Sequence, residues 1–153
     1  TMRTSDFQPL LLRSAVTALA CDGNIDQTEV DAVKRMAENE IYFLGYEYQQ
    51  PFDVFLDTIK AKGRVAVEKY LSELQQAPLN ERQKLLVVEV LIRVMDADDQ
   101  WAQNEKAFLH MAVRQMQLSL EALITGFPKH ADILSDDHSA SFDDSFHGVL
   151  SAK

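Results

Sequence analysis

The sequence contains little cysteine, glycine, proline and positive charge. Of its 153 residues, one is cysteine, 5 are glycine and 4 are proline, and 15 Lys and Arg stand against 24 Asp and Glu. The single cysteine, Cys21, excludes a disulfide within the chain and is typical of a reducing compartment, so we expect a cytoplasmic protein. The net charge of -9 argues against nucleic-acid binding, because phosphate recognition requires clustered Lys and Arg.

Long apolar runs are also missing. No stretch approaches the ~20 apolar residues that a membrane-spanning helix needs, and the richest run, residues 85–95, is interrupted by Glu89 and Arg93. The residues before Phe7 have no apolar core of the kind found in a signal peptide. We therefore expect no direct membrane insertion.

Helical periodicity is what the sequence does contain. Leu, Ala, Val, Glu and Gln are abundant, and apolar residues recur at three- and four-residue spacing, for example Leu11, Ala15 and Leu19. With the capping residues and the glycine or proline stops, this spacing predicts an all-α fold, a bundle of about seven helices. The expected helices cover residues 7–21, 26–45, 51–63, 64–76, 80–95, 102–116 and 119–127.

The composition changes at Pro128. We expect a helical domain over residues 7–127 and an acidic C-terminal tail over residues 128–153, which is either flexible or binds a partner. The tail is rich in Asp, Ser and His and contains a small apolar cluster. That cluster consists of Phe142, Phe146, Val149 and Leu150.

An acidic pattern occurs twice in the chain. In the first acidic junction (residues 22–29) Asp22 is followed seven positions later by Glu29, and in the second (residues 98–105) Asp98 is followed at the same offset by Glu105. The apolar helix before each junction and the amphipathic helix after it also match when the chain is shifted by 76 positions. The repeat predicts two related helix pairs that pack about a pseudo-twofold axis, with the helix of residues 80–95 against that of residues 7–21.

The first junction invites comparison with the calcium-binding EF-hand loop. With Glu29 at position 12 of the loop, Gly23 falls at position 6, as required. Positions 1 and 3 are then Ala18 and Ala20, and position 1 of the second copy is Val94. Because calcium takes roughly six to eight oxygen ligands, neither copy is a complete loop. A site shared by both copies, or a weak one completed by water, stays open.

Helix capping is an alternative explanation of the same residues. Asp26 is positioned to cap the following helix, with Glu29 hydrogen-bonding back to the backbone of the cap residue. The second copy has Ala102, a poor cap, at the equivalent place, so capping alone does not require the pair of Asp98 and Glu105 there. Capping, cation binding and an acidic recognition face remain as three interpretations.

The pattern Ala-x-Asp-Gly-x-Ile-x-x-x-Glu at residues 20–29, with its echo at residues 97–105, resembles the tellurite-resistance TerB-like family over residues 7–127. The resemblance implies an all-α fold of about seven helices built from two related halves. It also implies a site for a divalent cation such as calcium, magnesium or zinc. The implied ligands are Asp22, Glu29, Asp98 and Glu105, with Asp26 and Asp99 as further candidates. Asp99 stands where the first copy has Gly23, which leaves the symmetry of a shared site open.

The resemblance implies a biological context rather than a reaction. It points to a non-enzymatic stress-response module, of the tellurite- or phage-resistance type, that acts through protein partners, some of them membrane-associated. The alternative is a metal-independent adaptor or a co-chaperone-like interaction domain, although the chain has no His-Pro-Asp motif of its own. The sequence also has no nucleophile motif, Gly-rich phosphate loop or Ser-His-Asp signature, so we expect no enzyme.

Several isolated residues receive a structural interpretation. Cys21 lies beside Asp22, whose charge disfavours a thiolate, so we expect a packing residue. Trp101 takes the place of Ile25 in the repeat and is predicted to be buried. His110 is expected at the core or its boundary. The aromatic residues between positions 42 and 55 are expected in the core, with a partner-docking groove as the alternative. The tail histidines His130, His138 and His147 lack a compact metal-binding spacing.

Overall fold

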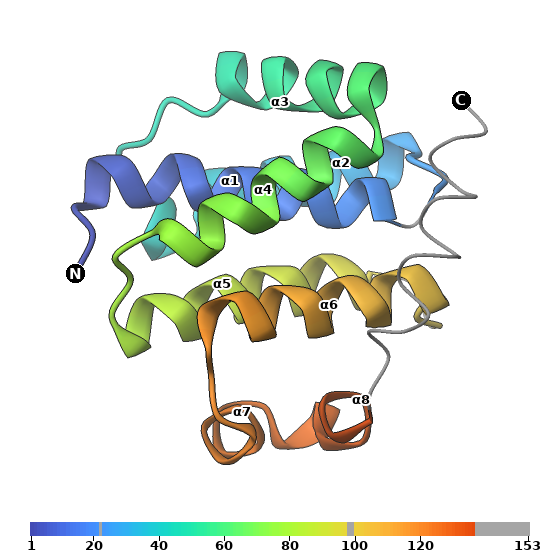
Figure 1. Cartoon of the computed structure of the whole chain (residues 1–153). Coiled ribbons are helices and arrows are strands. Elements are labelled where there is room, and N and C mark those ends of the chain that lie inside the picture. Colours follow the sequence, from blue (N-terminus) through green and yellow to red (C-terminus); the bar gives the residue numbers. More distant parts are fainter. Residues whose placement is uncertain (22, 98–99, 137–153) are drawn as a thin grey trace.

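The computed structural model describes residues 1–21, 23–97 and 100–136, and every regular element in these ranges is helical. The prediction of an all-α fold is therefore confirmed (Figure 1). The α-helices are α1 (Thr4–Cys21), α2 (Gln27–Asn39), α3 (Gln49–Lys62), α4 (Arg64–Gln76), α5 (Glu81–Met95), α6 (Gln103–Met116), α7 (Leu120–Gly126) and α8 (Ala131–Ser135). Two single-turn 3-10 helices, η1 (Ile41–Phe43) and η2 (Pro128–His130), precede α3 and α8.

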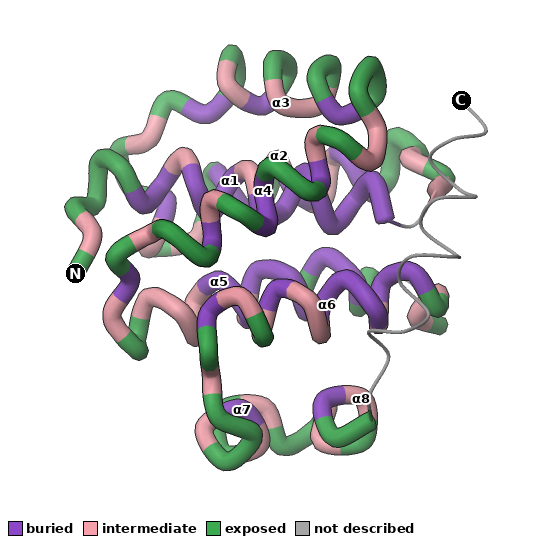
Figure 2. Tube along the Cα trace, in the orientation of Figure 1, coloured by how far each residue is buried: buried purple, intermediate pink, exposed green. Residues whose placement is uncertain are grey.

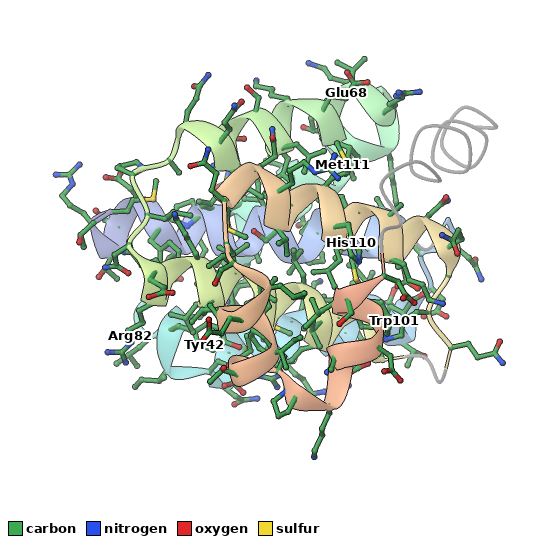
Figure 3. All side chains as sticks on the ribbon, turned by 60° about the horizontal axis from the view of Figure 1, so that its bottom comes forward. Tyr42, Glu68, Arg82, Trp101, His110 and Met111 are labelled. Carbon is green, nitrogen blue, oxygen red and sulfur yellow. The ribbon has the colours of Figure 1, made fainter. Side chains whose placement is uncertain are left out.

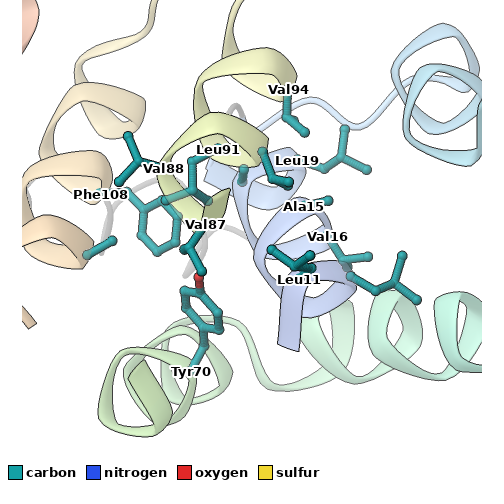
Figure 4. Close-up of a cluster of buried hydrophobic side chains, with 14 of the residues drawn as sticks. Leu11, Ala15, Val16, Leu19, Tyr70, Val87, Val88, Leu91, Val94 and Phe108 are labelled. Atoms are coloured by element: carbon teal, nitrogen blue, oxygen red, sulfur yellow. The ribbon is translucent and has the colours of Figure 1, made fainter. Parts of the chain in front are cut away.

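The centre of the molecule is the pair formed by α1 and α5, which pack against each other more extensively than any other two helices of the described chain. Figure 4 shows Leu11, Ala15 and Leu19 of α1 beside Val87 and Leu91 of α5. All five side chains are inaccessible or nearly so. Burying an aliphatic side chain of this size contributes roughly 1.5–3 kcal/mol, so this seam is a major source of stability. The predicted contact between these two helices is confirmed.

The two helix pairs also contact each other crosswise. α1 packs on its own partner α2 and on α6, and α5 packs on its own partner α6 and on α2. Met2 and Gln83 exchange two hydrogen bonds, of 3.0 Å and 2.7 Å, near the starts of α1 and α5. α1 and α5 therefore run in the same direction (Figure 1). Reciprocal contacts of this kind are expected of two related halves.

The remaining helices form the outer parts of the bundle. α3 and α4 lie on one side of the α5–α6 layer, and α7 and α8 lie on the other (Figure 1). Figure 2 shows buried residues along α1, α5 and α6, whereas α3 and α7 are largely exposed or half-buried. None of the described helices is long and apolar enough to cross a membrane.

One predicted helix limit is wrong, and helical structure continues beyond the last predicted helix. The second helix ends at Asn39 rather than near Gly45, because the chain turns there into η1. The side-chain amide of Gln8 on α1 donates hydrogen bonds to the carbonyls of Tyr42 (3.3 Å) and Leu44 (2.9 Å). These two loop carbonyls therefore have hydrogen-bond partners although α2 does not continue through the loop. The helical pattern also does not stop at Pro128. η2 and α8 follow it, and the side chain of Leu134 is buried.

Candidate functional site

Both acidic junctions lie at the same end of the bundle, because each follows the C-terminus of one of the parallel helices α1 and α5 (Figure 1). The two junctions are also adjacent. Glu29 of the first junction and Ala97, which precedes the second, line one small cavity of about 20 Å³, as does Arg93. A space of this size holds a single water molecule. The structure thus places the end of α5, which leads into the second junction, beside Glu29 of the first.

The first junction is built as a complete capping box. Gly23 has a φ of 77°, a left-handed conformation that glycine adopts without strain, and its N–H donates to the carbonyl of Ala20 at 3.1 Å. Asp26 then accepts a hydrogen bond from the backbone N–H of Glu29 at 2.8 Å, and Glu29 accepts one from the N–H of Asp26 at 3.4 Å. The predicted capping by Asp26 is confirmed.

The second junction uses only half of this arrangement. Ala102 has the extended backbone of a cap residue, with φ of -68° and ψ of 154°, but no side-chain acceptor. The carboxylate of Glu105 accepts the N–H of Ala102 at 2.7 Å, and its own N–H donates to the carbonyl of Ala102 at 3.0 Å. Capping therefore accounts for Glu105, because the glutamate caps the backbone without help from the cap side chain, whereas Asp98, the other half of the pair, lies outside the described residues.

The hydrogen bonds that Glu29 and Glu105 accept from the backbone matter for stability, because both carboxylates are buried. Glu29 is 6% exposed and Glu105 is 2% exposed, and buried carboxylates are costly unless charges or hydrogen bonds compensate them. One oxygen of each carboxylate accepts a hydrogen bond from a backbone N–H at the start of a helix, where no helical carbonyl is available to accept it. The repeated Asp-to-Glu spacing thus has, at its glutamate end, a structural cause in both copies.

A polar cluster lies at the second junction and has no counterpart among the described residues of the first. The indole N–H of Trp101 donates to Oδ1 of Asp96 at 2.8 Å, and Nε2 of His130 lies 2.8 Å from Oδ2 of the same carboxylate. The rings of Trp101 and His130 are 5.8 Å apart. Trp101 is half-buried rather than fully buried, because its N–H reaches an exposed acid. His130, expected in the tail, instead joins η2 to the end of α5.

A second histidine fixes the same C-terminal segment. Nε2 of His110 on α6 lies 2.7 Å from the carbonyl of Ile133 on α8, which confirms the expected boundary position of this side chain. Figure 3 looks onto this face of the bundle, with His110 and Trp101 labelled near α8. In the sequence, the feature that indicates the packing of η2 and α8 on the bundle is this pair of histidines. Their partners lie 23 and 34 residues away along the chain.

The described residues do not by themselves make a cation site. Of the six candidate ligands, Asp22, Asp98 and Asp99 lie outside the described residues. Asp26 is exposed and serves as a cap, and Glu29 and Glu105 are engaged with backbone N–H groups. No group of three or more His, Cys, Asp or Glu suited to a metal ion occurs within residues 1–21, 23–97 and 100–136.

Sequence reasoning missed Asn104, which lies beside Glu105. This side chain is 5% exposed, and its Oδ1 finds no hydrogen-bond partner within the described part of the chain. Its repeat equivalent, Thr28, is exposed. A polar residue next to a buried cap gave no signal in the sequence, because burial here depends on which segments cover α6.

The loop after α2 presents apolar side chains on a fixed backbone. Ile41 and Leu44 are 76% and 73% exposed, while Gln8 holds the loop carbonyls in place. Arg93 of α5 bridges Glu40 (2.9 Å) and the hydroxyl of Tyr42 (3.0 Å). Burial raises the pKa of Tyr42 to about 12, so its phenol stays protonated. Half of the predicted aromatic core is confirmed: Phe43, Tyr48 and Phe52 are buried, and the other three aromatic residues are half-buried against the core.

Cys21 is completely buried at the end of α1, as expected of a packing residue.

Together these observations define an all-helical bundle with two related helix pairs and an acidic, glutamate-capped junction in each. The chain matches the family model described as "Tellurite resistance protein TerB" over residues 11–125, and it belongs to this family. Neither the comparison with curated proteins nor the comparison with solved structures gives a match.

Proposed function

We propose that this chain is a non-catalytic module of a tellurite-resistance or related stress response in the cytoplasm, and that it acts through protein partners. The observation that carries the proposal is the family match over residues 11–125, supported by the pairing of the two acidic junctions at one end of the bundle. In this proposal the acidic end holds a divalent cation when Asp22, Asp98 and Asp99 join the capped glutamates.

A cation titration tests the acidic end. Calcium, magnesium, manganese and zinc are added separately to the full chain, and the melting temperature is measured. Binding to the folded state alone raises the melting temperature with ion concentration. The Asp22→Asn/Asp98→Asn variant should lose the rise. The matched control is Asp53→Asn/Asp57→Asn, which removes the same charge from exposed positions on α3.

Two results would reject the cation. One is no shift in the wild type with any of the four ions. The other is an equal shift in the wild type and in the junction variant. Substitutions of Glu29 or Glu105 are unsuitable here, because they remove capping hydrogen bonds and lower stability without any ion.

A metal-independent adaptor is the second candidate function. It is favoured by Ile41 and Leu44, two exposed aliphatic side chains on a loop whose carbonyls are fixed by Gln8. Such fixed apolar side chains are suited to a partner's pocket, because little conformational entropy is lost on binding. Ile41→Ser/Leu44→Ser should abolish co-purification of the partner from the source cell, whereas Leu120→Ser, also at an exposed leucine, should not.

A further inference from the structure

A groove lies between α1, α3 and α4. Its volume is about 370 Å³, and its walls are mostly apolar, with Val16, Phe55 and Ile59 among the lining side chains. Val54 and Val65 also line it and are 52% and 67% exposed. Apolar side chains that remain exposed around a concave surface are typical of a docking site for another apolar group.

The groove is positively charged, although the chain as a whole carries a net charge of -9. Three basic side chains and one carboxylate line it. Arg13 and the carboxylate, Glu73, form an ion pair of 2.8 Å with each other. Lys62 and Lys69 are exposed, and no ion pair joins either to a carboxylate within the described ranges. Two positive charges are therefore available to an acidic occupant.

The loop between α2 and α3 has the complementary character. It contains the 3-10 helix η1, and because such a helix has about 3.0 residues per turn, Ile41 and Leu44 lie on the same side of it. Their side chains are 76% and 73% exposed. Residues 36–59 contain five acidic side chains and no Lys or Arg. Two of the five, Glu38 and Glu47, are exposed, one before η1 and one after it.

The loop cannot reach the basic edge of its own groove. It leads directly into α3, whereas Lys62 is the last residue of that helix (Figure 1). Because α3 has 14 residues, the loop and Lys62 are separated by roughly 20 Å. The loop is also fixed in place, since Phe43 is buried and Gln8 donates hydrogen bonds to the carbonyls of Tyr42 and Leu44. An occupant with the chemistry of this loop must therefore come from a second copy of the chain.

We propose that the loop between α2 and α3 of one copy binds in the groove between α1, α3 and α4 of a second copy. The two exposed aliphatic side chains of the loop enter the apolar groove, and Glu38 and Glu47 lie near Lys62 and Lys69. Each pair of copies still has one free loop and one free groove, so the contact is head-to-tail and either adds a third copy or closes into a ring. This inference names a partner for the loop of the second candidate function, and rests on that function only for the premise that the loop docks.

Sedimentation of the purified full chain tests the contact. The weight-average mass is measured by analytical ultracentrifugation over a range of protein concentrations, at about 0.15 M salt, which screens the long-range repulsion between acidic copies. The contact is small, so we expect weak association, with a dissociation constant of roughly 0.1 mM. The mass of the wild type should rise with concentration above the 17.3 kDa of one chain. A mass that stays at 17.3 kDa up to roughly 1 mM would overturn the proposal.

Two variants each remove one side of the contact. Ile41→Ser/Leu44→Ser removes the apolar side chains of the loop, and Lys62→Glu/Lys69→Glu reverses the charge that the groove presents. Each should weaken the association about tenfold or more, because apolar burial is lost in the first and attraction becomes repulsion in the second. All four positions are exposed, so both variants should fold like the wild type.

Matched controls change similar side chains elsewhere. Leu120→Ser replaces an exposed leucine on α7, far along the chain from the loop. Lys60→Glu/Arg82→Glu makes the same change of total charge as the groove variant, at exposed positions that do not line the groove. Both controls should associate like the wild type.

A mixture of the two variants gives the decisive result. The loop variant retains an intact groove and the groove variant retains an intact loop, so together they can form one contact and no more. We expect a 1:1 pair that does not grow beyond two copies. A mixture that associates no more than its components, or a wild type whose association neither variant weakens, would overturn the proposal and leave the groove to an occupant of another kind. Because this test uses the purified chain alone, it can fail while co-purification of a different protein from the source cell succeeds.

Discussion

The two acidic junctions solve the same problem with different side chains. In both, a buried glutamate accepts the backbone N–H at the start of the next helix. The first junction adds the carboxylate of Asp26, whereas the second has Ala102 and is instead covered by Trp101 and His130. The difference shows that the glutamate is the shared structural part of the pattern, and that α6 begins without a side-chain cap at Ala102.

Substitutions of the two glutamates, Glu29 and Glu105, should give the largest change in the unfolding free energy. Glu105→Ala leaves the N–H of Ala102 without an acceptor in a buried place, which we expect to cost about 2–3 kcal/mol of unfolding free energy. Glu29→Ala should cost less, about 1–2 kcal/mol, because Asp26 still caps the helix and because the hydrogen bond that the N–H of Asp26 donates to the Glu29 carboxylate is longer, at 3.4 Å. Urea denaturation measures both. Glu105→Gln, which retains an acceptor oxygen, serves as the control, and equal losses for the two alanine variants would remove the distinction between the junctions.

Substitutions of the cap residues Asp26 and Ala102 should change the unfolding free energy by smaller amounts and in opposite directions. Asp26→Ala removes a side-chain cap and should lower the unfolding free energy by about 1 kcal/mol. Ala102→Ser supplies a cap at a residue whose backbone is already extended, and should raise it by about 0.5–1 kcal/mol. Thermal and urea denaturation report both values. A loss of stability in Ala102→Ser would mean that Trp101 and His130 leave no room for the hydroxyl.

Removing a contact of the segment formed by η2 and α8 should have the smallest effect on global stability. His130→Ala removes a partly exposed contact with Asp96, for which about 0.5–1 kcal/mol is expected. Its main consequence should be local, with faster amide hydrogen exchange in η2 and α8 and no change at Gly23 or Asp26. Lys129→Ala, at the neighbouring exposed position, is the control. Unchanged exchange in α8 would show that His110 alone holds the segment.

The fold was more predictable from the sequence than the site. Periodic apolar residues and capping signals placed the helices to within a few residues, because each helix buries one stripe in a common core. The end of α2 was missed because Gln8, far away in the sequence, satisfies the loop that follows. The extension past Pro128 was missed because α8 is short and is fixed by His110 and His130 rather than by periodicity.

At the site, local sequence was informative only for local contacts. The capping box of Asp26 and Glu29 spans three residues and was readable directly. The hydrogen bond of Glu105 to the backbone was not evident from the sequence, because Ala102 offers no cap side chain to indicate it. The contacts among Asp96, Trp101 and His130, and the burial of Asn104, depend on tertiary packing, which no local pattern encodes.

The buried cysteine gives the protein an internal reporter of its own opening. Cys21 is the one thiol of the chain, and it is completely inaccessible at the end of α1, next to the first junction. A thiol-specific reagent therefore reacts only with molecules in which α1 has separated from its neighbours. The labelling rate under native conditions, divided by the rate for a free thiol, then gives the free energy of that opening at the base of the acidic end, without an engineered cysteine.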